Sequence, residues 1–168
     1  MKKFELTTDF ITVFGIKLFR IKALVEFGTV KAGDLGGYVE KEENLDRDGD
    51  AWVSGNAQVF GDARVFGDAR VSGDARVSGN ARVSGNAQVS GDADYACVKG
   101  FGTEYRNTTF FREKYGTVKV SCGCFFGTIP EFRKQVENTR SGKIAKEYLM
   151  IADLMEFHFS KDGESGND

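Results

Sequence analysis

The chain has 168 residues, enough for one ordinary core or for a repeat array with an attachment at each end, and too few for two full catalytic domains. Lys and Arg total 23 and Asp and Glu total 25, so the net charge of -2 gives no overall field that attracts bulk nucleic acid or a membrane. Glycine is abundant at 21 residues while proline occurs once, which excludes collagen and indicates many tight turns.

The amino-terminal segment predicts a small β structure. Acids at Glu5 and Asp9 interrupt it before any apolar run long enough for a secretion signal, and no stretch of the chain approaches the roughly 18 apolar residues that span a bilayer. We therefore expect a cytoplasmic protein without membrane contact. Strand-like runs at 10–14 and 18–23, separated by a turn at Gly15, predict that residues 1–32 form a β cap.

A repeat with a period of six occupies the middle of the chain. Glycine recurs at every sixth position from Gly49 to Gly91, with alanine two positions later and, in nearly every unit, valine two positions after that. Ala-x-Val predicts a short strand with both apolar side chains on one side, and the Gly-Asp or Gly-Asn pair predicts a turn. Because a three-residue strand buries little alone, the units must stack into a solenoid.

The unit Val71-Ser72-Gly73-Asp74-Ala75-Arg76 resembles the hexapeptide-repeat family. The resemblance implies a left-handed parallel β-helix of triangular section, with three hexapeptides in each turn and about 4.8 Å between turns. An 18-residue turn predicts three outward stacks: Trp52 over Arg70 over Gln88, Gln58 over Arg76 over Asp94, and Arg64 over Arg82. Arg70 would then lie on the Trp52 ring and Arg76 would pair with Asp94, unless the arginines are simply solvated.

The β-helix is predicted over residues 33–96, with regular hexapeptides at 49–96 and a degenerate first turn at 33–48. In that first turn Leu35, Val39 and Leu45 fall in phase with the later apolar positions, whereas the charged Lys41 and Arg47 in two such positions require the turn to bulge or open. Outward aromatic side chains mark the early turns, which predicts that the amino-terminal segment or a subunit interface covers them; they are Trp52, Phe60 and Phe66.

Residues 97–160 predict an α+β module, followed by a disordered tail at 161–168. Strands are expected at 108–111 and 117–126. Thr128-Ile129-Pro130-Glu131 has the pattern of a capping box and predicts the start of a short helix, and apolar residues at helical spacing from Ile144 to Phe159 predict a second. The apolar face of this second helix should pack on the sheet.

The three cysteines, Cys97, Cys122 and Cys124, are expected to be free thiols, because the set is odd and no export signal precedes it. Alternation along the second strand predicts Cys122 and Cys124 on one buried face. Together with Cys97 and His158 they could hold a metal, but Cys-x-Cys lacks the usual structural-zinc spacing. We therefore predict core packing, with no metal and no cofactor.

The whole chain also resembles a group of phage and prophage proteins to which no activity is assigned. The resemblance implies a phage-infected bacterial cell as the setting. It is carried by the hexapeptides and by four further segments: Leu18–Leu24, Asp34–Glu40, Thr108–Arg112 and Cys122–Thr128.

Catalysis is not expected, and no catalytic residue is predicted. Many hexapeptide proteins are acyltransferases with a histidine as general base, but the single histidine, His158, lies far along the chain from the repeats. Residues 99–119 carry five bases and two acids among several aromatic side chains. This mixture could hold a nucleotide, with its base on a ring such as Tyr105 and its phosphates on basic side chains, namely Arg106, Arg112 or Lys119.

The sequence thus predicts a non-enzymatic binding protein, expected as a homo-oligomer, either a dimer or a trimer. It would interfere with a host factor in counter-defence, either by binding a host protein or by sequestering a signalling nucleotide. The alternatives are an acyltransferase-like enzyme or its remnant, and a structural or assembly protein.

Overall fold

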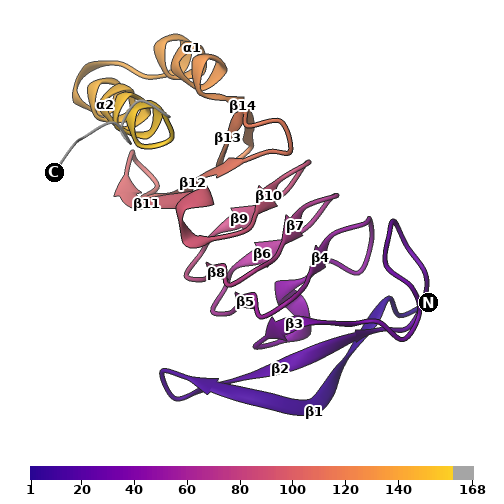
Figure 1. Cartoon of the computed structure of the whole chain (residues 1–168). Coiled ribbons are helices and arrows are strands. Elements are labelled where there is room, and N and C mark those ends of the chain that lie inside the picture. Colours follow the sequence, from indigo (N-terminus) through magenta and orange to yellow (C-terminus); the bar gives the residue numbers. More distant parts are fainter. Residues whose placement is uncertain (161–168) are drawn as a thin grey trace, which may run out of the picture.

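A computed structural model describes residues 1–160, so the tail predicted at 161–168 lies outside the described residues. Three parts follow one another along the molecule: a β-hairpin, a β-solenoid, and a four-stranded sheet covered by two helices (Figure 1). The fold is therefore mainly β, as predicted. None of the described helices combines the length and apolar character needed to cross a membrane.

The solenoid consists of very short strands that pair in parallel with the strand 18 residues further on. Arg64 lies beside Arg82, and Val65 beside Val83, with both valines fully buried. Trp52, Arg70 and Gln88 form a second stack, which confirms the predicted register. The strands are β4 (Trp52–Val53), β5 (Gln58–Val59), β6 (Arg64–Val65), β7 (Arg70–Val71), β8 (Arg76–Val77), β9 (Arg82–Val83) and β10 (Gln88–Val89).

Two of the predicted outward contacts are wrong. Asp94 does not stack on Arg76, because the chain leaves the repeat in a 3-10 helix, η2 (Asp92–Asp94). The Asp94 carboxylate pairs instead with Arg112, at 3.3 Å. Arg70 is the strand partner of Trp52 but makes no cation-π contact with its ring among the described residues, and the Trp52 ring packs edge-on against Phe27, with 5.3 Å between the ring centroids.

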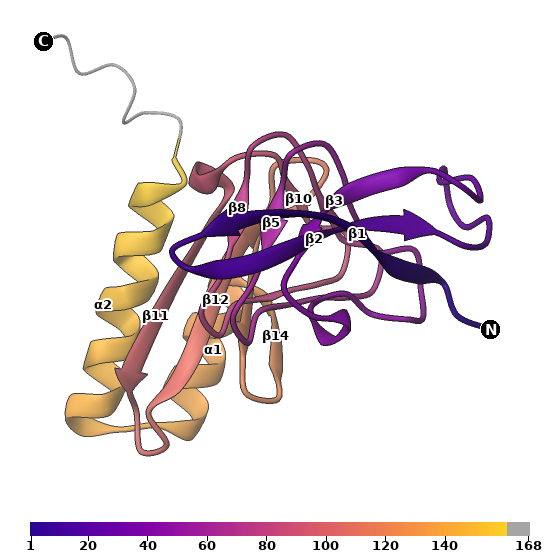
Figure 2. The same cartoon turned by 90° about the horizontal axis from the view of Figure 1, so that it is seen from below.

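The amino-terminal hairpin extends one face of the solenoid. Strand β1 (Phe4–Val13) turns at Phe14 and Gly15, both with positive φ, into β2 (Ile16–Ala23). Positive φ at both turn residues suits a type I′ turn, the usual two-residue hairpin connection. Strand β2 pairs with β3 (Leu35–Val39), and β3 runs parallel to β5, so hairpin and solenoid share one sheet (Figure 2).

The degenerate first turn contains the expected bulge, but its phase differs from the prediction. Val39 lies beside Val59 and Leu45 beside Val65, 20 positions apart instead of 18. The two additional residues lie just after Leu45, in the acidic segment 46–48. Leu35 is 58 % exposed, so its predicted core position is wrong. A 3-10 helix, η1 (Glu42–Asn44), replaces a strand in this turn.

Two side chains satisfy backbone carbonyls at the amino-terminal end of the solenoid, where no preceding turn supplies N–H donors. The Asn44 Nδ2 donates to the carbonyls of Gly61 and Ala63, at 3.1 and 2.9 Å. The Lys3 Nζ donates to the carbonyls of Gly49 and Ala51, at 3.2 and 2.9 Å. Both side chains are buried, so each satisfies polar groups that would otherwise lack partners in the interior.

Replacing Lys3 with methionine is expected to lower the free energy of unfolding by about 1–2 kcal/mol, because two carbonyls lose their donor while the apolar stem is retained. Burial lowers the pKa of Lys3 from its ordinary value of 10.5, with Asp46 and Asp50 opposing that shift. The unfolded chain therefore keeps this proton to higher pH, so stability from Lys3 rises with pH between its folded pKa and 10.5. Urea unfolding across that range should show the natural chain gaining stability relative to Lys3→Met, and a constant difference would contradict the assignment.

The other end of the solenoid is closed by a sheet of four antiparallel strands, in the order β11, β12, β13, β14. Successive side chains of the central strand β12 point into two different cores. Phe111 packs into the solenoid core, while Phe110 packs under the helices. Thr109 Oγ1 accepts a hydrogen bond from the backbone N–H of Arg82, at 3.1 Å. The strands are β11 (Tyr95–Phe101), β12 (Arg106–Arg112), β13 (Val118–Cys122) and β14 (Phe125–Thr128).

The prediction of one strand over 117–126 is wrong. Cys122 pairs directly with Phe125, so Gly123 and Cys124 form a two-residue hairpin loop. Gly123 has a φ of 58°, which glycine adopts at little cost and which suits the first position of a type II′ turn. Cys124 is exposed at the turn and Cys122 is half-buried, so the two cysteines do not share a buried face.

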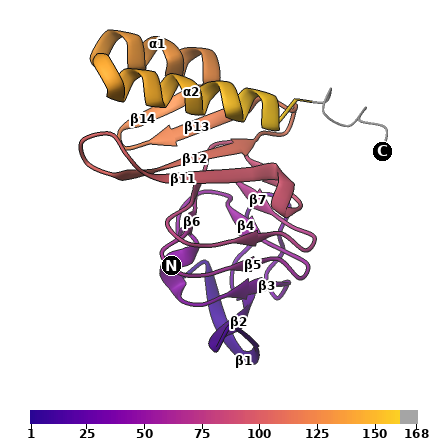
Figure 3. The ribbon, with the colours of Figure 1, turned by 90° about the vertical axis from the view of Figure 1, so that its left-hand side faces the viewer.

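Both helices begin as predicted and cover the outer face of the sheet (Figure 3). The first, α1 (Ile129–Thr139), starts with the capping box: Thr128 Oγ1 accepts from the N–H of Glu131, and the Glu131 carboxylate accepts from the N–H of Thr128. The second, α2 (Gly142–His158), packs its apolar face against the module core.

Candidate functional site

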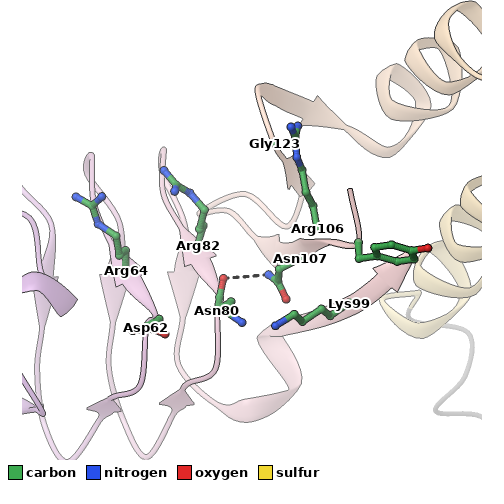
Figure 4. A pocket seen from close by; sticks show the side chains of 9 residues that line it. Asp62, Arg64, Asn80, Arg82, Lys99, Arg106, Asn107 and Gly123 are labelled. Atoms are coloured by element: carbon green, nitrogen blue, oxygen red, sulfur yellow. Dashed lines mark hydrogen bonds between the residues drawn. The ribbon is translucent and has the colours of Figure 1, made fainter. Parts of the chain in front are cut away.

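An open groove of about 380 Å³ lies where the solenoid meets the carboxy-terminal sheet. Arg64 of β6 and Arg82 of β9 project side by side, and Arg106 of β12 continues the row (Figure 4). Lys99 of β11 reaches the groove floor from the other side, beside Asn80. Two different sheets, one in the solenoid and one in the carboxy-terminal module, thus place four cationic side chains around one space.

Asparagines form the floor and hold the two parts together. Asn107 Nδ2 donates to the backbone carbonyl of Asn80 at 3.0 Å and to Thr109 Oγ1 at 3.0 Å. These bonds fix the first residues of β12 against the last turn of the solenoid. Arg106, which precedes Asn107, lies across the Gly123 turn, where a side chain larger than hydrogen would meet its guanidinium.

The cationic side chains of the groove form no direct ion pairs, although Arg64 also borders a second pocket that is lined by acidic residues, namely Glu42, Glu43, Asp46 and Asp48. Within residues 1–160, no ion pair involves Arg64, Arg82, Lys99 or Arg106. The one acid in the lining, Asp62, is bound to Lys41 at 3.0 Å. Like charges directly opposite each other on parallel strands repel, so the Arg64–Arg82 pair destabilises the ligand-free fold. An anion bound between the two guanidinium groups would remove this repulsion.

The structure brings together only part of the binding set predicted from sequence. Tyr105 and Arg106 both line the groove, and Tyr105 is 67 % exposed. Arg112 lies at the opposite end of β12, where its guanidinium pairs with Asp94 and donates to the Phe159 carbonyl at 3.2 Å. Lys119 lies over the Phe126 ring, 5.7 Å from its centroid, so neither of these two belongs to the groove.

The aromatic side chains predicted as cap or interface contacts lie in three different surroundings. Trp52 is buried beneath the amino-terminal segment, against Phe27. Phe60 is half-buried, and it lines an open pocket together with Phe14 of the hairpin turn. Phe66 has the Arg82 guanidinium over its ring at 5.2 Å, which helps to hold that arginine beside the groove.

Sequence reasoning missed five groove residues as a site: Arg64, Asn80, Arg82, Lys99 and Asn107. The predicted register did place Arg64 over Arg82, and this stack of two cationic side chains could have indicated an anion site. What the sequence lacked was any indication that β12 would continue the same face and add Arg106 to the row.

The cysteines show no nucleophilic arrangement. All three are free thiols, as predicted. Cys97 is exposed at the surface, so its predicted core packing is wrong. Desolvation of its sulfur atom is the main cause that raises the pKa of Cys97, although hydrogen bonds with Thr109 and Asn107 oppose the shift. Among the described residues, no group of three or more His, Cys, Asp or Glu side chains could hold a metal ion.

The repeats that carry Arg64 and Arg82 match a known family model. A model described as YdcK beta solenoid repeat matches residues 57–73, 69–85 and 75–91. The chain is a repeat β-solenoid protein. The starts of the three overlapping matches differ by multiples of six, in agreement with the hexapeptide period of the sequence. No curated protein matches the chain.

Proposed function

We propose that this repeat β-solenoid protein is a non-enzymatic binding protein whose groove holds a phosphate-bearing small molecule, with a nucleotide as the preferred class. The observation that carries the proposal is the row of Arg64, Arg82 and Arg106 with Lys99 opposite, none of them paired with a carboxylate among the described residues. Guanidinium groups bind phosphate oxygens in pairs of parallel hydrogen bonds, and several of them together suit a polyanion.

The remaining lining supports a nucleotide over inorganic phosphate. Tyr105 offers an exposed ring on which a base can stack, while Asn80 and Asn107 offer amide groups for its edge. The volume of about 380 Å³ falls at the lower end of the range for small-molecule pockets. A mononucleotide or a compact dinucleotide fits these requirements better than a long polymer.

The biological setting follows from the phage-like resemblance: the protein would sequester a signalling nucleotide of the bacterial host during infection, in the cytoplasm. Capture of a host protein is the second form of the same counter-defence proposal, and in that form the exposed row of arginines would meet an acidic surface. The coil is proposed to be left-handed, the sense that the hexapeptide resemblance implies.

The first test measures binding by calorimetry and thermal unfolding, using ATP, cyclic mononucleotides, cyclic dinucleotides and inorganic phosphate as probes. A ligand present at about 100 times its Kd should stabilise the fold by about 2.7 kcal/mol. The double variant Arg82→Glu, Arg106→Glu should weaken nucleotide binding about 100-fold, because two charge-assisted contacts become repulsive.

Arg76→Glu is the matched control, because Arg76 occupies the same position of the repeat on a different face of the solenoid. It should leave nucleotide affinity unchanged. No stabilisation by any nucleotide at millimolar concentration would overturn the nucleotide proposal. Stabilisation by acetyl-coenzyme A alone would favour the acyltransferase alternative, and co-purification with phage particles would favour the assembly alternative.

A further inference from the structure

We propose that an aromatic cleft beside the groove holds the second base of a dinucleotide, while the first base lies on Tyr105 and the phosphates lie on the arginines between them. The inference rests on the proposed function, because it names the class of nucleotide that the groove would take. The cleft has a volume of about 370 Å³ and shares two lining residues with the groove, Arg82 and Gly123. The two spaces therefore adjoin each other.

The cleft exists because a serine takes the place of a phenylalanine in the repeat. Phe66 and Ser84 each follow a buried valine, and these two valines lie side by side in successive turns of the solenoid. The two residues therefore occupy equivalent positions one turn apart, and both line the cleft. Since the Ser84 side chain is much smaller than a phenyl ring, its turn leaves open the space between Phe66 and the carboxy-terminal sheet.

The opposite wall of the cleft comes from the carboxy-terminal sheet. Ser121 of β13 lies directly opposite Phe126 of β14, so both side chains project from the same side of the sheet. That side faces the solenoid, because a Cβ at Gly85 would lie 3.0 Å from the Phe126 ring. The solenoid and the sheet thus each supply one aromatic wall, Phe66 and Phe126, against which a planar base can pack.

Two nearly buried hydroxyl groups in the cleft lack a partner. Ser84 and Ser121 are only 4 and 7 % exposed, and neither hydroxyl forms a hydrogen bond within residues 1–160. In that part of the chain, Gln58 Oε1 is the one fully enclosed side-chain polar atom without a partner, so the two serine hydroxyls open into the cleft that they line. A hydroxyl both donates and accepts, which matches the carbonyl and amino groups along the edge of a base.

The charges around the cleft favour a neutral ring inside it and a phosphate at its edge. Among the described residues, Arg82 is the only charged residue in the lining, and its guanidinium lies over the Phe66 ring, 5.2 Å from the centroid. The nearby Glu113 carboxylate and Lys119 ammonium have opposite charges and lie outside the lining. A phosphate held by Arg82 therefore links a base in the cleft to a nucleotide in the groove.

The experiment compares a mononucleotide with a dinucleotide by calorimetry. AMP probes the groove, whereas the linear dinucleotide pApA, which carries a second adenosine, probes the groove and the cleft together. We expect the natural chain to bind pApA at least about tenfold more tightly than AMP, the usual gain from stacking one further base. Ser84→Leu, which fills the cleft, should remove that gain and leave the affinity for AMP unchanged. Ser72→Leu is the matched control, because Ser72 occupies the same position of the repeat on a different face of the solenoid.

Two further measurements do not require the cleft to accept a larger side chain. Ser84→Ala combined with Ser121→Ala should weaken the binding of pApA about tenfold and leave that of AMP unchanged, because two hydrogen bonds to the second base are lost. Cys124 is exposed and lines the cleft, so pApA should slow its alkylation by iodoacetamide, whereas AMP should not. Cys97 is also exposed but lines a different pocket, and mass spectrometry should show its alkylation unchanged.

The outcomes distinguish this inference from the proposed function. If neither AMP nor pApA binds at millimolar concentration, the groove is not a nucleotide site and both proposals fail. If AMP binds but pApA binds no more tightly, or if the cleft variants keep the full advantage of pApA, this inference alone is overturned. Loss of AMP binding in a Ser84→Leu chain that circular dichroism shows to be folded would place the first base in the cleft, which also contradicts the arrangement of two bases.

Discussion

Replacing Asn44 with leucine is expected to lower the free energy of unfolding by about 4 kcal/mol, because three buried or part-buried polar groups lose their partner at once. The Asn44 amide donates to the carbonyls of Gly61 and Ala63, and its Oδ1 accepts from the N–H of Lys41 at 2.9 Å. Leucine has nearly the same shape, so the cavity is filled and the loss measures the polar contacts alone. Urea unfolding followed by circular dichroism gives the free energy.

The control for Asn44 is Asn56→Leu, since Asn56 is exposed in an ordinary turn of the repeat. Its replacement should change the free energy of unfolding by less than about 0.5 kcal/mol. Asn44→Asp should be at least as damaging as leucine at neutral pH, because a carboxylate would face two carbonyl oxygens without a donor. A loss below about 1 kcal/mol for Asn44→Leu would show that water replaces the side chain at this end of the solenoid.

The interior of the solenoid was predictable because the residues within each hexapeptide determine its local conformation and its buried side. Alanine and valine two residues apart determine which side is buried, and glycine with positive φ determines where the chain turns. Stacking then follows from the period, which is why Val65 and the Arg64–Arg82 pair lie where the register placed them. No long-range information is needed beyond the repetition.

The ends of the solenoid were not predictable for the opposite reason. Lys3 and Asn44 have no local pattern that identifies them as donors to carbonyls more than 15 residues away in sequence. The same applies to the Cys122–Phe125 hairpin. Alternating apolar residues continue through Gly123, so the pattern favours one strand, whereas the positive φ of that glycine reverses the chain.

The candidate site was only partly predictable, because it is formed between two structural units. Tyr105 and Arg106 were predicted because basic and aromatic residues are abundant in their part of the sequence. The same part also contains Arg112 and Lys119, whose side chains the sheet places outside the groove. Residues six apart on one strand are separated by about 20 Å, so a charge count along the sequence does not define a site. The groove exists because Asn107 binds Asn80 and aligns β12 with the solenoid face.

Gly73→Ala is expected to lower the free energy of unfolding by about 3 kcal/mol or more, whereas Gly79→Ala should cost only about 1 kcal/mol. The two glycines occupy the same position in successive hexapeptides, with φ of 61° and 66°, so both substitutions carry the same left-handed backbone strain. They differ in surroundings. A Cβ at Gly73 would lie 2.6 Å from the carbonyl oxygen of Ser90, while a Cβ at Gly79 meets no atom within 4 Å.

The difference between the two variants therefore isolates the contact between turns from the strain within one turn. The Ser90 carbonyl belongs to the backbone just before η2, where the chain leaves the repeat, so relieving the overlap requires the last turn to move. Because Asp94 at the end of η2 pairs with Arg112, that movement also disturbs the junction with β12. Thermal and urea unfolding of both variants measure the difference, and equal losses would mean that the turns of this solenoid are spaced widely enough to accept a methyl group between them.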